Sequence, residues 1–225
     1  MKFRPEVKPF LLASFVFGVF IYAVGIVSGA SNGLAFFVGL LFGGAGTGYM
    51  LFFFRDPEMV TPAEPGTVVA AASGKLAKIA EVYEKDYLKQ DTVRISIFLS
   101  LFDVHVNRFP IGGFSTFLGY FPGKRLFTFD EKSSDVNQHN AILVRNDETS
   151  CLVRQIVGPV CRRVVYWLRE DKTTVVKQGE RFGMMKFGSR LDMYFPKGDI
   201  EMVAKIGDQV TAGETIIARI AKKGN

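Results

Sequence analysis

A histidine with a nearby carboxylate is the first feature of this 225-residue chain that could do chemistry. His105 follows Asp103 by two residues, so in a strand both side chains would lie on one face. An imidazole pKa of about 6.5 suits proton transfer at neutral pH, which makes His105 a candidate acid and base. The other histidine, His139, lies in the polar stretch 133–140, where we expect a solvated loop.

The remaining reactive side chains are weaker signals when taken alone. Ser189 follows Gly188, but an isolated Gly-Ser pair is most often a turn. Cys151 and Cys161 are too far apart for a C-x-x-C motif, and two histidines cannot easily complete a zinc site. We therefore predict no metal centre and two reduced thiols in the core.

Charge is distributed unevenly along the chain, and the net charge of +6 predicts an anionic partner. The basic residues are scattered, without a block interleaved with aromatic residues, so a membrane surface is favoured over nucleic acid. Residues 10–54 contain no Asp, Glu, Lys or Arg. The charged remainder of the sequence is long enough for one compact domain with its own core.

Two apolar runs, about residues 10–30 and 34–54, are each long enough to cross a bilayer, which takes about 20 residues. Turn-forming residues 29–33 separate them. A cleaved signal peptide is the alternative, but the first run is long for one and a second run follows at once. We predict a membrane hairpin over residues 1–54 and a second domain over residues 55–225.

The flanking charges predict how the hairpin is oriented. Lys2, Arg4 and Lys8 precede the first run, and Arg55 follows the second. The positive-inside rule then places both ends, and the domain that follows, on the cytoplasmic side of the cell membrane. Small residues in the second run, mainly glycines over 39–48, would let the two helices approach closely.

Short apolar segments separated by glycine and proline dominate the rest of the chain. The segments 93–99, 141–144, 151–157 and 160–167 are rich in β-branched residues, and no long segment has a helical period. We predict a mainly β domain of sandwich or barrel type.

An internal repeat supports that fold class. Residues 176–182 and 210–216 share the pattern V-x-x-G-E-x-apolar, in which the glycine suits a tight turn. The pattern is similar to that of biotinyl- and lipoyl-carrier domains and predicts two related β halves. A carrier module, with Lys186 after Met185 as the attachment site, is one hypothesis, although the residues that follow Lys186 point elsewhere.

Four motifs together resemble the short phosphatidylserine decarboxylases. They are residues 53–57, 98–110, 152–158 and 186–190, which read FFRDP, FLSLFDVHVNRFP, LVRQIVG and KFGSR. They occur in the order typical of that family, and the resemblance spans residues 53–220. The predicted hairpin before them is also similar to that family.

The resemblance implies an enzyme that decarboxylates phosphatidylserine to phosphatidylethanolamine during phospholipid biosynthesis. It implies that Ser189 attacks the carbonyl of Gly188, that the chain is cut between them, and that Ser189 becomes a covalent pyruvoyl group. The pyruvoyl carbonyl would form a Schiff base with the substrate amine and accept electrons as carbon dioxide leaves, with His105 carrying protons. The two chains of the precursor would stay associated. Homo-oligomerisation and an ester or ether lipid linkage, as in archaetidylserine decarboxylases, stay open.

The sequence departs from the family pattern at two positions. Longer relatives carry a second histidine where this chain has Arg108, but the short group generally has Asn-Arg there, so the other departure is the more important one. Members commonly have Ala-Asp-Gly where this chain has Ala72-Ser73-Gly74, and that Asp is the expected partner of the histidine in self-cleavage. Ser73 cannot act as a carboxylate, so Asp103 is the candidate substitute. A catalytically inactive, uncleaved relative that binds acidic phospholipid is therefore the alternative function.

Four cations are candidates for binding the phosphate and carboxylate of the lipid substrate, because guanidinium and ammonium groups pair with both anions. The alternative for each is ordinary surface solvation. They are Arg55, Arg108, Lys186 and Arg190.

Overall fold

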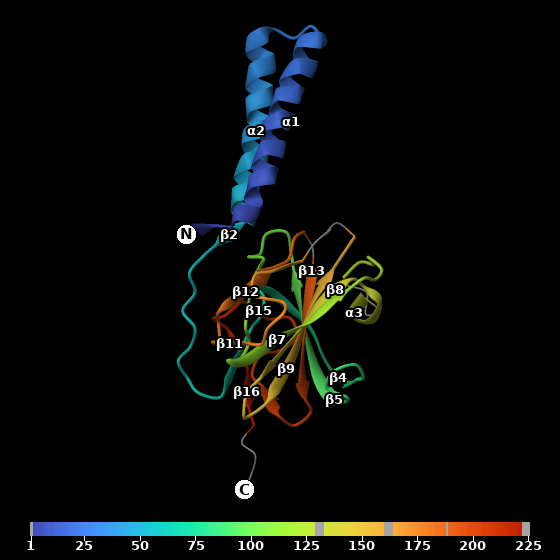
Figure 1. Ribbon diagram of the computed structural model, residues 1–225. Coiled ribbons are helices and arrows are strands. Elements are labelled where there is room, and N and C mark those ends of the chain that lie inside the picture. Colours follow the sequence, from blue (N-terminus) through green and yellow to red (C-terminus); the bar gives the residue numbers. More distant parts are fainter. Residues whose placement is uncertain (1, 129–132, 160–163, 188, 222–225) are drawn as a thin grey trace. The chain divides into compact units, whose positions relative to one another are not determined.

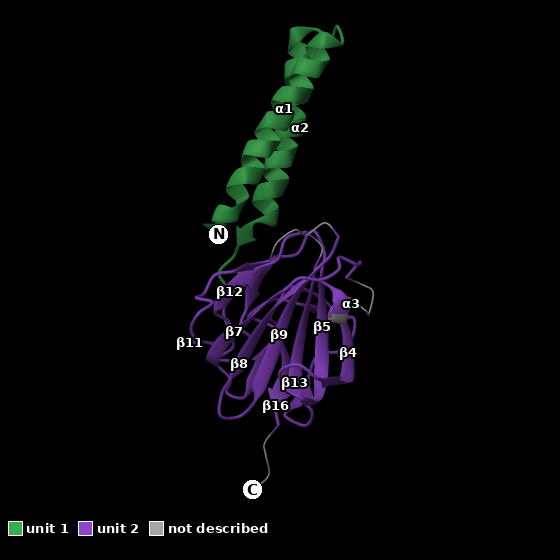
Figure 2. Ribbon diagram, turned by 45° about the vertical axis from the view of Figure 1, so that its right-hand side comes forward, with its two compact units in different colours: residues 1–58 green, residues 59–225 purple. Residues whose placement is uncertain are grey.

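The computed structural model describes residues 2–128, 133–159, 164–187 and 189–221 (Figure 1). The chain divides into two compact units, residues 1–58 and 59–225, and each is described by itself (Figure 2). The first unit is a helical hairpin and the second is built of β-strands, so the predicted mainly β fold with an N-terminal helical hairpin is confirmed.

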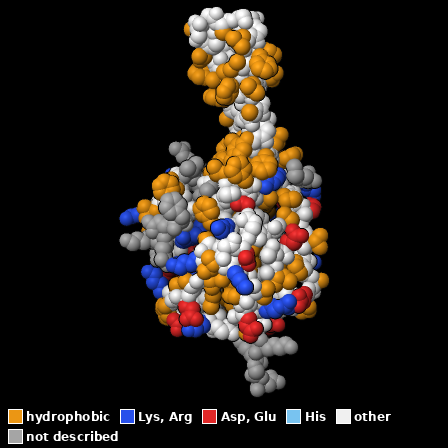
Figure 3. All heavy atoms as spheres, turned by 180° about the vertical axis from the view of Figure 1, so that it is seen from behind, with side chains coloured by type: hydrophobic (Ala, Val, Ile, Leu, Met, Phe, Trp, Pro, Cys, Tyr) orange, Lys and Arg blue, Asp and Glu red, His pale blue; other side chains and the backbone are white. Residues whose placement is uncertain are grey.

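The hairpin consists of α1 (Lys8–Val27) and α2 (Asn32–Phe53), preceded by the short 3-10 helix η1 (Pro5–Val7). Ser31 begins α2, and its hydroxyl accepts a hydrogen bond from the backbone N–H of Leu34 at 3.4 Å. Spans 5–27 and 32–53 are long and apolar enough to cross a membrane, judged by length and composition. Hydrophobic side chains gather over the surface of the hairpin (Figure 3).

The two ends of the hairpin are tied together by backbone pairing. Strand β1 (Lys2–Phe3) pairs antiparallel with β2 (Arg55–Asp56). Arg4 adds a hydrogen bond to a carboxylate oxygen of Asp56 at 3.3 Å. Residues before the first helix therefore lie beside residues after the second helix, which brings together the flanking charges seen in the sequence.

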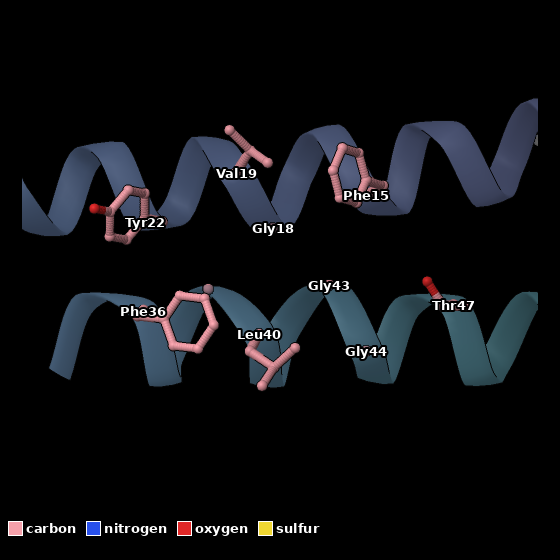
Figure 4. Close-up of a pocket in the computed structure, with 10 residues that line it drawn as sticks. Phe15, Gly18, Val19, Tyr22, Phe36, Leu40, Gly43, Gly44 and Thr47 are labelled. Atoms are coloured by element: carbon pink, nitrogen blue, oxygen red, sulfur yellow. The ribbon is translucent and has the colours of Figure 1, made fainter. Parts of the chain in front are cut away.

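Glycines set the close approach of the two helices. A Cβ atom on Gly39 would lie 2.7 Å from the carbonyl oxygen of Gly18, and one on Gly43 would lie 3.1 Å from the Cα of Gly18. Both glycines are buried, as the sequence predicted for small residues of the second run. Gly44 has open space around it, because it lines an apolar groove of about 640 Å³ between Phe15 and Leu40 (Figure 4).

The second unit has two layers. One layer is an eight-stranded antiparallel sheet in the order β11-β7-β8-β9-β13-β5-β4-β15. Its strands are β4 (Gly74–Glu84), β5 (Gln90–Leu99), β7 (Gly113–Phe121), β8 (His139–Arg145), β9 (Ser150–Val157), β11 (Thr174–Val176), β13 (Ser189–Pro196) and β15 (Gln209–Val210).

The other layer consists of two three-stranded antiparallel sheets, in the orders β10-β12-β6 and β14-β16-β3. Their strands are β3 (Thr67–Val69), β6 (Val106–Arg108), β10 (Val165–Tyr166), β12 (Arg181–Met184), β14 (Ile200–Met202) and β16 (Ile216–Ile220). One short helix, α3 (Ser133–Val136), lies between β7 and β8 in the chain.

The strand orders show two related halves. The strand order of the large sheet is the same from each edge inward. A strand of two or three residues comes first, then two long strands that follow one another in the chain, and then one of the two central strands, β9 or β13. Each half adds one three-stranded sheet. One half is the continuous segment 106–184, whereas the other is split into residues 67–99 and 189–220. The chain therefore crosses between halves twice, at residues 100–105 and 185–188.

The repeated V-x-x-G-E segments occupy equivalent places in the two halves. Each forms a turn, with Gly179 and Gly213 both at φ +76°, before the central strand of a three-stranded sheet. The turns meet, because a Cβ on Gly213 would lie 3.4 Å from the Cα of Gly179. Arg108 is buried beside them and donates to the carbonyl oxygen of Gly179 at 2.9 Å.

The main core lies on one face of the large sheet, between the layers. On β13, Leu191, Met193 and Phe195 belong to this core, whereas Tyr194 belongs to a smaller cluster on the opposite face. Alternation along the strand places Ser189 on the same face as the main core. Arg190 and Asp192 lie on the other face, so the two sides of β13 differ in chemistry.

The glycine contacts of the hairpin yield the first prediction. Gly39→Leu should force α1 and α2 apart, because its Cβ has no room beside the Gly18 carbonyl. Gly44→Leu is the matched control, since nothing lies within 4 Å of a Cβ there. In detergent, thermal loss of helical circular dichroism should occur at a lower temperature for Gly39→Leu. Equal melting of the two variants would contradict the packing.

Candidate active site

Ser189 is the first residue of β13, at the centre of the large sheet. It pairs in register with Leu99 at the end of β5 and with Val157 at the end of β9. The side chain is fully buried, and its Oγ has no hydrogen-bond partner among the described residues. A buried hydroxyl without a partner is costly, which marks this position as a candidate for function.

The backbone just before Ser189 is strained. Phe187 has φ +56°, in the left-handed region that bulky residues rarely occupy. Only one other residue besides glycines, Lys89, has a positive φ in the described part of the chain. Gly188, the predicted first residue of the cut, lies outside the described residues. The strain at Phe187 is therefore one residue away from the predicted cleavage site.

His105 lies at the end of the other crossing between the halves, directly before β6, and is fully buried. Its Nδ1 is 2.9 Å from the carbonyl oxygen of Asp103, and its own carbonyl accepts the N–H of Met185 at 3.2 Å. Because a carbonyl only accepts, Nδ1 carries the proton and the lone pair of the neutral ring is on Nε2. The fold thus brings His105 beside the segment that leads into Ser189.

Asp103 contacts His105 differently from the sequence prediction. Residues 100–105 form a turn, so the expectation of a strand with both side chains on one face is wrong. The Asp103 carboxylate accepts the backbone N–H and the hydroxyl of Ser100, at 2.8 and 2.6 Å, and the amide of Gln209 at 3.0 Å. Its backbone carbonyl, not its carboxylate, orients the imidazole of His105.

Ser73 lies on the link between β3 and β4 and is buried. Its Oγ accepts the backbone N–H of Ala212 at 3.0 Å, in the second of the repeated turns. The next residue, Gly74, packs its Cα against the carbonyl of Phe98, where a Cβ would clash. Since Phe98 precedes the β5 residue that pairs with Ser189, position 73 lies near the same end of the sheet.

Arg190, predicted to bind substrate, has its guanidinium buried among protein groups. It donates to the carbonyl oxygen of Thr128 at 2.9 Å and to the hydroxyl of Ser134, and pairs with Asp192 at 3.1 Å. Ser134 also donates to Asp192 at 2.6 Å. This Arg190–Asp192–Ser134 cluster ties the strand after the predicted cut to the part of the chain before it.

The other predicted cations are described within their own units. Arg108 is buried between the repeated turns, in the three-stranded layer. Lys186 is half-buried within the crossing 185–188. Arg55 belongs to the hairpin unit, where it donates to the Phe52 carbonyl at 2.7 Å and lies over the Phe52 ring. The structure brings Lys186 and Ser189 into one junction and places Arg108 apart from it.

His139 is the residue whose environment the sequence predicted least well. It is the buried first residue of β8, so the expected solvated loop is wrong. Its ring stacks on Phe121 with centroids 5.0 Å apart, and burial lowers its pKa.

Cys151 is a buried free thiol, and burial raises its pKa well above the usual range. Cys161 lies outside the described residues.

Sequence reasoning did not single out a buried chain of three amides that crosses the layers. Asn140 on β8 donates to Gln155 on β9 at 3.2 Å, and Gln155 donates to Asn107 on β6 at 2.7 Å. The available signal was Gln155 itself, a polar residue in the apolar segment 151–157 that should face a core. Asn140 and Gln155 are almost the only polar side chains on the core face of β8 and β9.

Fold and site together describe a two-layer β enzyme domain with a serine and a histidine at the crossings between its halves. A family model for phosphatidylserine decarboxylase matches residues 47–218. A phosphatidylserine decarboxylase proenzyme of Syntrophus aciditrophicus is 42% identical over 168 residues, covering 74% of this chain and 78% of that protein. The corresponding proenzyme of Chlorobium chlorochromatii is 44% identical over 171 residues, covering 76% and 79%.

The chain belongs to the phosphatidylserine decarboxylase family. A third relative, the proenzyme of Carboxydothermus hydrogenoformans, is 40% identical over 172 residues, which cover 76% of this chain and 80% of the relative. Each of these relatives is named a proenzyme, a word that implies processing of the chain.

The buried ion pair yields the second prediction. Arg190→Met would leave the Asp192 carboxylate buried without its cation, so the free energy of unfolding should fall by about 3–5 kcal/mol. Lys197→Met is the control, because the Lys197–Glu81 pair is exposed and its loss should change little. Urea unfolding in detergent can be followed by the fluorescence of Trp167, the only tryptophan. If both variants lost the same free energy of unfolding, the buried Arg190–Asp192 pair would contribute no more to stability than the exposed pair.

Proposed function

We propose that this protein is a membrane-associated decarboxylase that converts phosphatidylserine to phosphatidylethanolamine with a pyruvoyl group made from Ser189. The observation that carries the proposal is the buried Ser189 at the start of β13, whose Oγ has no partner within the described part of the chain, in a member of the phosphatidylserine decarboxylase family. The proenzyme names of the relatives support processing of this chain also, and none of them favours the uncleaved, inactive alternative.

The surroundings of Ser189 fit a pyruvoyl group. Its Oγ makes no hydrogen bond that conversion would destroy, and Leu99 and Val157 flank it in register with apolar side chains. A pyruvoyl group at this position supplies an electrophilic carbonyl that accepts the electron pair released when carbon dioxide leaves. The apolar flanks exclude water from the reacting end of β13.

His105 is the proton carrier that we propose for both self-cleavage and decarboxylation. The Asp103 carbonyl holds the proton on Nδ1, so Nε2 takes up a proton from the reacting group and later returns it. Burial and the backbone bond to Met185 fix the ring next to the crossing that leads to Ser189. Asp103 orients this histidine through its backbone, and Ser73 is an auxiliary residue that steadies the turn at Ala212.

The large and small chains would remain together after cleavage. The small chain, residues 189–225, contains β13, which pairs with β5 on one side and β9 on the other. It also contains β15, which pairs with β4, and β16, which pairs with β3. Three of its strands are thus hydrogen-bonded to strands of the large chain, in addition to the shared core.

The hairpin would hold the enzyme at its lipid substrate. We propose that it crosses the membrane with Lys2, Arg4, Lys8 and Arg55 on the cytoplasmic side, where the catalytic domain would also lie. Lys186, which is half-buried and lies shortly before Ser189, is the cation that we propose for the carboxylate or phosphate of the substrate. Arg108 and Arg190 are already engaged inside the protein, which favours a structural role for both.

Self-cleavage is the third prediction and the direct test of the proposal. The purified protein should consist of residues 1–188 and 189–225, and the short chain should lack a free amine and react with a carbonyl reagent. Ser189→Ala should remain one chain and release no carbon dioxide from phosphatidylserine. Ser150→Ala, at the start of the related central strand β9, is the matched control and should be cut normally. Intact mass decides, and a single uncut, inactive natural chain would refute the function.

The fourth prediction concerns the proton carrier. His105→Ala, assayed on chains that are already cleaved, should release carbon dioxide about 100-fold more slowly, because a general acid and base is lost. His139→Gln removes the other histidine, which is on β8, and should retain most of the turnover. The measurement is trapped labelled carbon dioxide from carboxyl-labelled phosphatidylserine. Undiminished turnover in His105→Ala would remove this residue from the mechanism.

A further inference from the structure

Two of the buried polar atoms between the layers that have no hydrogen-bond partner among the described residues lie on β13 and β6. One is Ser189 Oγ, and the other is Nδ2 of Asn107 on β6, whose side chain is also fully buried. A buried donor and a buried hydroxyl that are both unsatisfied are costly to keep. Their coexistence in one apolar region needs an explanation other than stability.

The register of the sheet places the two groups close together. Gln155 is on β9, two residues before Val157, the residue that pairs with Ser189. Diagonal neighbours of this kind on one face of a sheet have Cβ atoms at most about 7–8 Å apart. Because Gln155 is hydrogen-bonded to Asn107 at 2.7 Å, the Asn107 amide reaches the same patch of the core as Ser189.

A glycine permits this contact between the layers. Gly183 on β12 pairs in register with Asn107. A Cβ on Gly183 would lie 3.1 Å from Nε2 of Gln155 and would clash with the carbonyl oxygen of Val165. A larger residue would therefore push Gln155 away from Asn107, so the sequence leaves space at 183 for the amide chain.

The direction of the amide chain determines which atom of Asn107 is left over. Asn140 donates to Gln155 Oε1, and Gln155 Nε2 donates to Asn107 Oδ1. The acceptor of Asn107 is therefore occupied, and its donor Nδ2 is unoccupied. Donation along the chain polarises the last amide, which makes Nδ2 a better donor toward an oxygen that gains negative charge.

We propose that Asn107 is a catalytic residue of self-cleavage, whose Nδ2 donates a hydrogen bond to Ser189 Oγ while that oxygen attacks. In this step Ser189 Oγ loses its proton to a base and bonds to the Gly188 carbonyl carbon. The carbon–nitrogen bond between the two residues then breaks, and the nitrogen of Ser189 takes up a proton. The product is an ester isomer of the peptide, so no other reactant is needed.

The donor has a physical role in that step. The attacking oxygen gains negative charge before the new bond is complete, and the described residues that form the surrounding core cluster are apolar. His105 and Asn107 flank Val106 at the start of β6, so base and donor approach from the same small sheet. The inference rests on the proposed self-cleavage and adds to it the residue that stabilises the nucleophile.

The test follows the cleavage of full-length chains in detergent by intact mass. Asn107→Leu keeps the volume but removes the amide, and Asn107→Asp keeps the acceptor for Gln155 but removes the donor. Both should cut at least about 100-fold more slowly than the natural protein, the usual effect of losing one such donor. Neither should accumulate a chain that neutral hydroxylamine cleaves between residues 188 and 189, because under that condition the ester is cleaved and the amide is not.

Ser96→Ala is the matched control. Its Oγ is also buried and has no partner in the described ranges, but it lies opposite Asp192, on the other face of the large sheet, so this variant should cut normally. If either Asn107 variant were cut at the rate of the natural protein, or accumulated the ester, only the proposed role of Asn107 would be overturned. Failure of the natural protein to cut would instead overturn the proposed function. Melting temperatures distinguish a folding defect from a catalytic one. Loss of a purely structural residue would lower the melting temperature and leave the rate of cutting unchanged.

Discussion

The position of β13 between β5 and β9 is the constraint on which the rest of the domain depends. This strand is hydrogen-bonded on both sides, and its two neighbours belong to different halves. It is the central strand of the split half, so the chain must cross over just before it. A cut at that crossing breaks the chain before β13 and leaves the pairing of residues 190–196 in place, which is why cleavage there is compatible with an intact fold.

The same topology places both proposed reactive groups next to the crossings between the halves. Two related halves built from one chain require two crossings, and the described residues of both crossings belong to no strand. His105 ends one crossing and Ser189 begins immediately after the other, with the Met185–His105 backbone bond between them. The left-handed backbone at Phe187 adds strain at the second crossing, and the Arg190 cluster holds the strand beyond it. Strain before the cut and rigid support after it favour a reaction that relieves strain without displacing the nucleophile.

The sequence predicted those features that depend on local patterns. An uncharged run of residues 10–54 predicts a helical hairpin because no other element tolerates it, and the V-x-x-G-E repeat predicts paired turns because its glycines need positive φ. It misplaced Asp103 and His105, since alternating apolar and polar residues look like a strand although Ser100 caps a turn there. Buried Arg190 could not be recognised from local pattern at all, because its partners Thr128 and Ser134 are about sixty residues away in the chain.

Ser73 can be understood from what a carboxylate at that position would provide. In a triad the acid both orients the histidine and stabilises its cationic form. Here orientation comes from the Asp103 backbone carbonyl, which needs no charged side chain at position 73. The Ser73 hydroxyl instead accepts a hydrogen bond from the Ala212 N–H, and the carboxylate of an Asp at this position could accept the same bond. Of the two contributions of the acid in a triad, Ser73 therefore fails to provide only the stabilisation of the charged imidazole. Loss of that one contribution would slow proton transfer but leave the proposed nucleophile, the proposed base and the strained backbone in place, so Ser73 favours a proenzyme that is cut more slowly over an inactive one.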